Sequence, residues 1–217
     1  MKAGRVMTAG TFTATAITSR WFSRALILFG CGCLGWVAFG LLQAKAFERF
    51  GEQRLAEASR ALHRHGAITG KTLKLAQAAR TEARTSGVIG RISLPRAGIS
   101  AIIAEGTTDT TLSRSVGHVP GSAFPGENGN TVLAAHRETH FRGLKMVQTG
   151  DRAILTTPDG AFEYRVESTS IVGPADTEVM QETPDSMLTL ITCYPFNYLG
   201  HAPQRYVVRA RQVLRPI

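Results

Sequence analysis

Three residues in the C-terminal half of the chain, His136, Cys193 and Arg205, belong to the types that catalyse acyl transfer. A thiolate attacks a peptide carbonyl, an imidazole protonates the leaving amine, and a guanidinium stabilises the oxyanion or holds the substrate backbone. Each residue alone also has an ordinary structural role, since cysteine packs as a small hydrophobe and polar side chains form hydrogen bonds at strand ends. Spacing by itself does not decide between these interpretations.

Cysteine usage favours the catalytic interpretation. Cys193 is the only cysteine outside the apolar N-terminal stretch, which contains the other two, Cys31 and Cys33. A domain outside the cell lies in an oxidising compartment, where a single thiol cannot form an intramolecular disulfide and is a liability unless it has a function. We expect Cys31 and Cys33 to be small packing residues rather than metal ligands.

The three candidate residues occupy similar positions in their segments. His136 ends the run NTVLAAH, Cys193 ends the run MLTLITC, and Arg205 begins the run RYVVRARQVL. If these strands are neighbours with matching ends, the three side chains converge at one rim of a sheet. A nearby cation would also favour the thiolate form of the cysteine.

The segment after Gly87 has the composition of a small all-β domain. Its apolar runs are rich in Val, Ile, Leu, Thr and Tyr, and turn residues such as the Pro-Asp-Gly of 158–160 separate them. No strand–helix–strand rhythm appears, so we expect a small closed or nearly closed barrel rather than a parallel α/β sheet. The predicted strands are 88–94, 99–104, 130–136, 151–157, 161–172, 187–193 and 205–214.

The net charge of +9 is confined to the N-terminal part of the chain. Residues 1–90 hold 13 Lys and Arg against 4 Asp and Glu, whereas residues 91–217 hold 12 of each. A nucleic-acid-binding domain needs a basic face of its own. The neutral C-terminal domain is therefore not expected to bind nucleic acid.

The stretch Ala25–Ala44 contains 20 residues without a charge. A helix with a rise of about 1.5 Å per residue crosses the hydrocarbon core of about 30 Å with this length. The short basic head before it favours a cytoplasmic N-terminus and a C-terminal domain outside the cell. Ala44-Lys45-Ala46 matches a cleavage pattern, but the apolar stretch is longer than a signal peptide needs, so an uncleaved single-pass anchor in the cell membrane is expected.

These features divide the chain into four parts. Apolar residues after the anchor repeat at helical spacing, which predicts a helical stalk. The predicted parts are a cytoplasmic basic segment (1–24), a transmembrane anchor (25–44), a helical stalk and linker (45–87) and a β-barrel with the three candidate residues (88–217).

Three segments, NTVLAAHRETHFRGL, LTLITCYPF and RYVVRARQV, resemble the signature segments of sortases, the membrane-anchored cysteine transpeptidases of bacteria. The upstream segments IGRISLPRAGISAIIAEGTT and GHVPG follow the layout of the same family, so the resemblance covers about residues 88–214. The block TLITC followed by an arginine is specific, and AAHRETHF makes the chain look most like class D sortases. The apolar connection YPFNYLGHAPQ departs from the family pattern in a region that shapes the substrate pocket.

The resemblance implies a fold and a role for each candidate residue. The fold is an eight-stranded antiparallel barrel, and because seven runs are clear, the eighth strand is expected to be short or to come from a bend within 161–172. Cys193 is the implied nucleophile, His136 the general acid and then base, and Arg205 the clamp for the oxyanion and substrate.

The resemblance also implies a reaction and its partners. The enzyme would cleave an LPxTG-like motif through a thioester on Cys193 and transfer the acyl group to an amine, such as a cell-wall peptide or a pilin lysine. Its protein partners would be substrates with C-terminal sorting signals. No cofactor and no metal site are expected; some sortases use calcium, but no acidic cluster here matches such a site.

Two other functions compete with this one. A zinc hydrolase would use His136, Glu138 and His140, but the H-E-x-x-H pattern has its glutamate second and lies on a helix, whereas Glu138 is third and follows a strand. A non-catalytic membrane-tethered β-domain that binds or scaffolds envelope proteins would have a buried and inert Cys193. His118 is expected to be structural.

Overall fold

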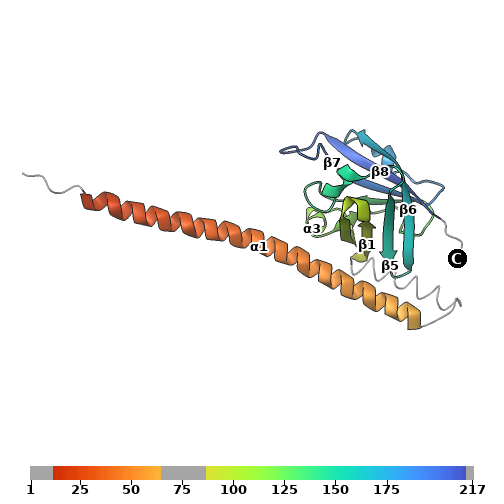
Figure 1. Ribbon diagram of the computed structural model, residues 1–217, viewed down its shortest axis with the longest axis horizontal. Helices are drawn as coiled ribbons and strands as arrows, with labels where there is room; N and C mark the ends of the chain where they lie inside the picture. Colours follow the sequence, from red (N-terminus) through yellow and green to blue (C-terminus); the bar gives the residue numbers. More distant parts are fainter. Residues whose placement is uncertain (1–11, 65–86, 214–217) are drawn as a thin grey trace, which may run out of the picture. The chain divides into compact units, whose positions relative to one another are not determined.

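The computed structural model describes residues 12–64 and 87–213 (Figure 1). The chain divides into two compact units, Met1–Gln43 and Ala44–Ile217. One helix, α1 (Phe12–Arg64), covers both the predicted anchor and the first part of the predicted stalk. Residues 1–11 of the predicted basic segment, 65–86 of the predicted stalk and 214–217 lie outside the described residues.

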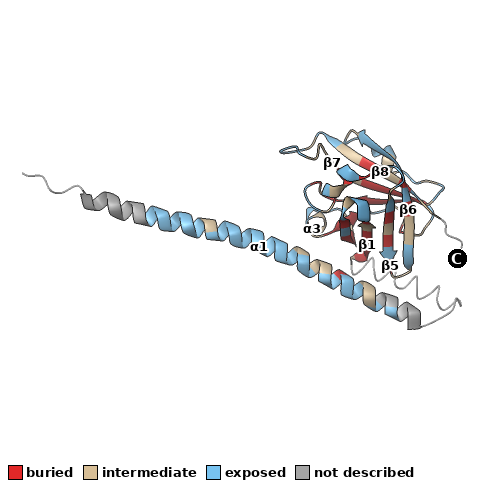
Figure 2. Cartoon of the chain, viewed as in Figure 1, coloured by how far each residue is buried: buried red, intermediate tan, exposed pale blue. Residues whose placement is uncertain are grey.

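The N-terminal part of α1 exposes its apolar side chains. Within it, Trp21–Glu57 is long and apolar enough to cross a membrane, with a mean hydropathy of 2.2 in its most apolar window. Large residues such as Phe29 and Trp36 are exposed, as the pale colour of this part of α1 in Figure 2 shows. Its uncharged stretch, residues 25–44, contains no buried residue and is compatible with a single-pass membrane anchor.

The second unit contains a closed eight-stranded barrel, as predicted from the sequence. The strands follow the order β1-β2-β3-β4-β7-β8-β6-β5, and β5 pairs with β1 to close the barrel. The strands are β1 (Val88–Leu94), β2 (Ile99–Glu105), β3 (Val116–His118), β4 (Asn130–Ala134), β5 (Arg152–Thr157), β6 (Gly160–Val172), β7 (Met187–Tyr194) and β8 (Gln204–Gln212). Short helical turns connect them: η1 (Pro95–Ala97), α3 (Asp109–Leu112), η2 (Arg142–Met146) and η3 (Thr177–Met180).

Two details of the barrel differ from the sequence-based expectation. Within the described residues six neighbouring strand pairs are antiparallel, but β2–β3 and β4–β7 are parallel. The eighth strand is the short β3, as one of the two alternatives proposed, and it does not come from a bend within β6. β3 has three residues and is stabilised by non-local pairing with β2 and β4, so it leaves little pattern in the sequence.

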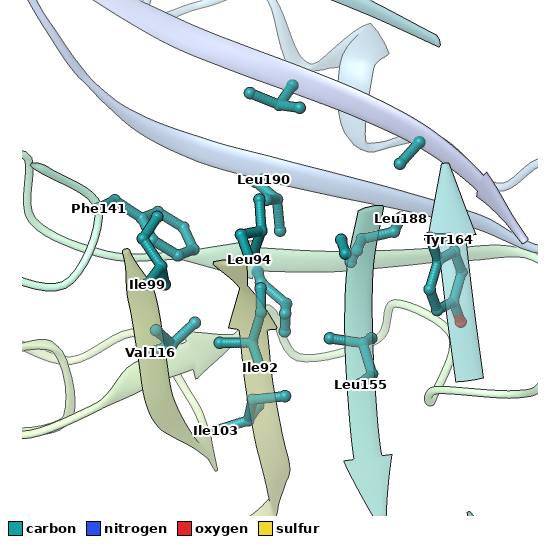
Figure 3. Packing of buried hydrophobic residues seen from close by; sticks show 14 of the residues in the cluster. Ile92, Leu94, Ile99, Ile103, Val116, Phe141, Leu155, Tyr164, Leu188 and Leu190 are labelled. Atoms are coloured by element: carbon teal, nitrogen blue, oxygen red, sulfur yellow. The ribbon is translucent and has the colours of Figure 1, made fainter. Parts of the chain in front are cut away.

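The core fills the inside of the barrel with alternate residues of each strand. Figure 3 shows Ile92 and Leu94 of β1 together with Leu188 and Leu190 of β7 in this core. Because successive residues of a strand point to opposite faces, the residues between them face outward. Each fully buried leucine or isoleucine stabilises the barrel by about 1.5–3 kcal/mol.

His118, at the end of β3, is fully buried. Its Nδ1 lies 2.9 Å from the Glu105 carboxylate, and its Nε2 lies 3.1 Å from the Ala123 carbonyl and 3.0 Å from the Ser122 hydroxyl. Both ring nitrogens therefore bind oxygen atoms of the surrounding barrel and of the β3–β4 connection. This arrangement agrees with the structural role expected from the sequence.

Candidate active site

Cys193 and Arg205 are direct partners across the antiparallel pair β7–β8. Side chains directly opposite in such a pair lie on the same face, with Cβ atoms about 4.5–5.5 Å apart. Leu190 and Val208 of the same two strands point into the core, so the alternation directs Cys193 and Arg205 to the outer face. The strand register thus brings the candidate thiol and the candidate guanidinium together.

His136 follows the end of β4, which pairs with β7 on the side away from β8. The parallel pairing reaches Ala134 and Ile191, and the Ala135 amide then donates to the Ile191 carbonyl at 3.3 Å. His136 stands two residues after Ala134, and Cys193 stands two residues after Ile191. With neighbouring strands about 4.8 Å apart, this alignment places the His136 backbone beside the end of β7 that carries Cys193.

The backbone around His136 is a tight turn rather than the last part of a strand. β4 ends at Ala134 because the His136 carbonyl accepts hydrogen bonds from the amides of Thr139 (3.3 Å) and Phe141 (3.1 Å) instead of a strand partner. Phe141 and Leu144 are fully buried in the core and anchor the end of this turn. The prediction of a strand over 130–136 was therefore two residues too long.

None of the three candidate side chains is fully buried. Cys193, His136 and Arg205 each keep partial exposure, unlike the core residues beside them. The Arg205 Nη1 donates to the carbonyls of Ala202 (3.2 Å) and Gln204 (3.0 Å). This leaves its Nη2 and Nε without a hydrogen-bond partner in the described part of the chain, so the three N–H groups of these two nitrogens remain for a substrate oxygen.

The β6–β7 connection covers the outer face of the sheet below these residues. Val132, Thr189 and Val207 face outward by alternation and yet are buried. Asn130 holds the β6–β7 connection in place, because its Nδ2 donates to the carbonyls of Val179 (3.1 Å) and Gln181 (3.0 Å). The connection around η3 is therefore tied to the outer face at the start of β4, at the opposite end of this strand from His136.

The apolar β7–β8 connection has two different parts. Tyr194 and Phe196, at its beginning, pack with Tyr206 of β8, with ring centroids 5.2–6.2 Å apart. Tyr198 and Leu199, at its tip, are exposed, and the Leu199 side chain is 96% accessible. The connection that departs from the family pattern thus exposes apolar side chains at its tip, on the segment that joins Cys193 to Arg205 in the chain.

His140 lies in the turn after His136. Burial lowers the pKa of the His140 imidazole, and the nearby His136 also lowers it, while Glu48 opposes the shift. Among residues 12–64 and 87–213, no group of three or more His, Cys, Asp or Glu side chains is arranged to hold a metal ion. His136, Glu138 and His140 accordingly do not form the donor set that the zinc-hydrolase alternative needs.

Sequence reasoning did not identify one residue of this region, Arg137. The residue is buried, and its guanidinium donates to backbone carbonyls of the β7–β8 connection. In the sequence it appears only as a polar residue in a turn, and its partners are carbonyl groups, which carry no sequence signal.

The closed eight-stranded barrel places Cys193 and Arg205 opposite each other on neighbouring strands, with His136 just beyond the end of the next strand. The family description "Sortase domain" matches residues 92–213. Sortase D of Bacillus subtilis (strain 168) is 35% identical to this chain over 166 residues, which cover 75% of this chain and 84% of that protein. The chain belongs to the sortase family, and it is a sortase-type transpeptidase.

Solved structures agree with this assignment. The sortase D5 transpeptidase of Clostridium perfringens is 31% identical, with a TM-score of 0.54, over 58% of this chain and 79% of that one. Sortase A of Listeria monocytogenes is 25% identical, with a TM-score of 0.54, over 59% of this chain and 88% of that one. The family and the fold expected from the signature segments are thereby confirmed.

Proposed function

We propose that this sortase is a membrane-anchored cysteine transpeptidase that cleaves an LPxTG-like sorting motif through a thioester on Cys193 and transfers the acyl group to an amine. The observation that supports the proposal most strongly is the cross-strand pair of Cys193 and Arg205, with His136 on the adjacent strand end. A nucleophile, an acid–base group and an oxyanion donor on one face form the arrangement that acyl transfer requires.

The first half-reaction forms the thioester. The Cys193 thiolate attacks the carbonyl carbon of the Thr–Gly bond, and the carbonyl oxygen becomes an oxyanion that receives hydrogen bonds from the Arg205 guanidinium. His136, as imidazolium, donates a proton to the glycine nitrogen. The carbon–nitrogen bond then breaks, the C-terminal fragment leaves as an amine, and the acyl group remains on the sulfur.

The second half-reaction transfers the acyl group. A primary amine of a cell-wall peptide or a pilin lysine attacks the thioester carbon, and neutral His136 accepts the proton that the amine loses. Collapse of the second oxyanion breaks the carbon–sulfur bond and returns the Cys193 thiolate. Attack by water instead of the amine gives hydrolysis, so the site must favour the amine.

The anchor fits this reaction. With residues 25–44 of α1 in the membrane and the barrel outside the cell, enzyme and membrane-tethered substrate share one surface, which raises their effective concentration. Weak recognition of a short peptide then suffices for turnover. The proposal requires no cofactor. A comparison of activity in the presence of a chelator with activity in added calcium tests this directly.

The test uses the full chain in detergent or nanodiscs with a library of sorting peptides and several amines. We expect a ligated peptide–amine product from the native protein and none from Cys193→Ala. Ligated product from Cys193→Ala would refute the assignment of the nucleophile. A native protein that gives no product, with Cys193 unreactive to alkylation before denaturation, would support the scaffold alternative.

A further inference from the structure

Arg137, the residue after His136, is a buried arginine whose burial the proposed reaction does not explain. Arginine side chains are almost never fully buried unless they are paired, and that of Arg137 is 5% exposed. The Glu138 carboxylate lies 2.8 Å from its Nε, but this nitrogen forms no hydrogen bond, so the contact is an ion pair away from the N–H direction. The buried Nη1 also lacks a partner among the described residues.

The guanidinium is held by the β7–β8 connection instead. Its Nη2 donates to the Tyr198 carbonyl at 2.8 Å and to the Gly200 carbonyl at 3.1 Å. Both acceptors are backbone atoms more than sixty residues away in the sequence. One side chain therefore ties the turn that begins with His136 to the tip of the connection that joins Cys193 to Arg205.

This tie bridges the two parts of the candidate site. His136 reaches the site from β4, whereas Cys193 and Arg205 reach it from β7 and β8. Strand pairing fixes the strands themselves, but His136 already lies beyond the end of β4, and the β7–β8 connection leaves the barrel with an exposed tip. A charged donor that binds two neutral carbonyls holds such a connection more firmly than a neutral donor would.

Burial of a charge is costly, and a well-packed apolar side chain of similar volume is often as stable or more stable at such a position. A buried charge of this kind is explained if it specifies geometry. We propose that Arg137 is a positioning residue that fixes the β7–β8 connection against the turn of His136 and so sets the imidazole relative to the Cys193–Arg205 pair. This inference rests on the proposed function.

Arg137→Met is the sharpest variant, because it keeps the length and most of the volume of the side chain and removes both hydrogen bonds. Arg142→Met is the matched control, since Arg142 belongs to the same region after His136 but is exposed. We expect Arg137→Met to unfold at a denaturant concentration similar to that of the native chain while kcat/KM for a sorting peptide falls about 100-fold, as a misplacement of about 1 Å predicts. The loss should appear mainly in kcat for acylation.

Hydrogen exchange on full chains that also carry Cys193→Ala measures the tie without any turnover. Arg137→Met should speed amide exchange in residues 195–203 and leave β7 and β8 unchanged, and Arg142→Met should change neither. This measurement separates the positioning role of Arg137 from the proposed transpeptidase function, because it reports on the β7–β8 connection even if no sorting peptide is cleaved. Unchanged exchange in 195–203 would overturn the inference.

Arg137→Lys covers the case in which the methionine variant does not fold. It keeps the charge but lacks the planar fork, so we expect a folded chain with faster exchange in residues 195–203 and partly reduced kcat. Native exchange and native kcat in Arg137→Lys would contradict the role of the two carbonyl contacts.

Discussion

Replacement of Arg205 tests whether the guanidinium opposite Cys193 stabilises the oxyanion. Arg205→Met keeps the aliphatic stem and removes all the donors, whereas Arg205→Lys keeps a charge without the planar fork. In the structure Nη1 is occupied by the carbonyls of Ala202 and Gln204, which leaves Nη2 and Nε to serve the reaction.

The size of the effect follows from these contacts. Loss of an oxyanion donor lowers kcat by about 10²–10³, which is about 2.7–4 kcal/mol of transition-state stabilisation. The two hydrogen bonds to carbonyls contribute about 1 kcal/mol each to stability, which is small against a total of about 5–15 kcal/mol. Arg205→Met should therefore remain folded while it loses most of its activity, and Arg205→Lys should fall between it and the native chain.

Single-turnover cleavage of a sorting peptide under rapid quench measures the acylation step, and thermal unfolding checks the fold. Arg209→Met is the matched control, because Arg209 lies four residues along β8 on the same outer face. We expect Arg209→Met to keep native kcat. If Arg205→Met acylates within threefold of the native rate, the oxyanion role is wrong. It is also wrong if Arg205→Met and Arg209→Met lose activity equally.

Three further predictions address the site and the barrel. His136→Ala should lower kcat by about 10²–10⁴ with little change in unfolding, as loss of a general acid and base predicts; native kcat would exclude that role. His118→Phe should destabilise the barrel by about 1–3 kcal/mol in urea unfolding, because the oxygens around the imidazole lose their buried partner; unchanged stability would contradict this. The lowered pKa of His140 means that the unfolded chain binds its proton more readily, so stability should fall as the pH drops below 6.5. His140→Gln should lose less stability than the native chain between pH 7.5 and 5. Equal losses would refute the claim that the His140 pKa is lowered in the folded chain.

Most strands of the barrel could be predicted because they are short runs of β-branched and apolar residues between turn residues. The predicted runs 88–94 and 187–193 match β1 and β7 to within one residue. The short β3 could not be predicted, since three residues leave no periodic pattern. The parallel pairing of β4 with β7 depends on contacts between segments far apart in the chain, which local patterns do not report.

Part of the candidate site could also be predicted from the sequence. The positions of His136, Cys193 and Arg205 at the ends of runs indicated that they could meet, but only the register makes Cys193 and Arg205 direct partners. Arg137 belongs to one of the signature segments, but nothing in the sequence indicated its burial or its contact with the β7–β8 connection. Its burial and its carbonyl partners depend on how the β7–β8 connection folds back over the turn after β4.

The mass of the intact enzyme after mixing with a sorting peptide in the absence of added amine tests the central claim most directly. The account predicts an adduct with the mass of the N-terminal peptide fragment, mapped to Cys193 and released by hydroxylamine as a thioester should be. An adduct on another residue, or cleavage of the peptide through a different residue in Cys193→Ala, would contradict it.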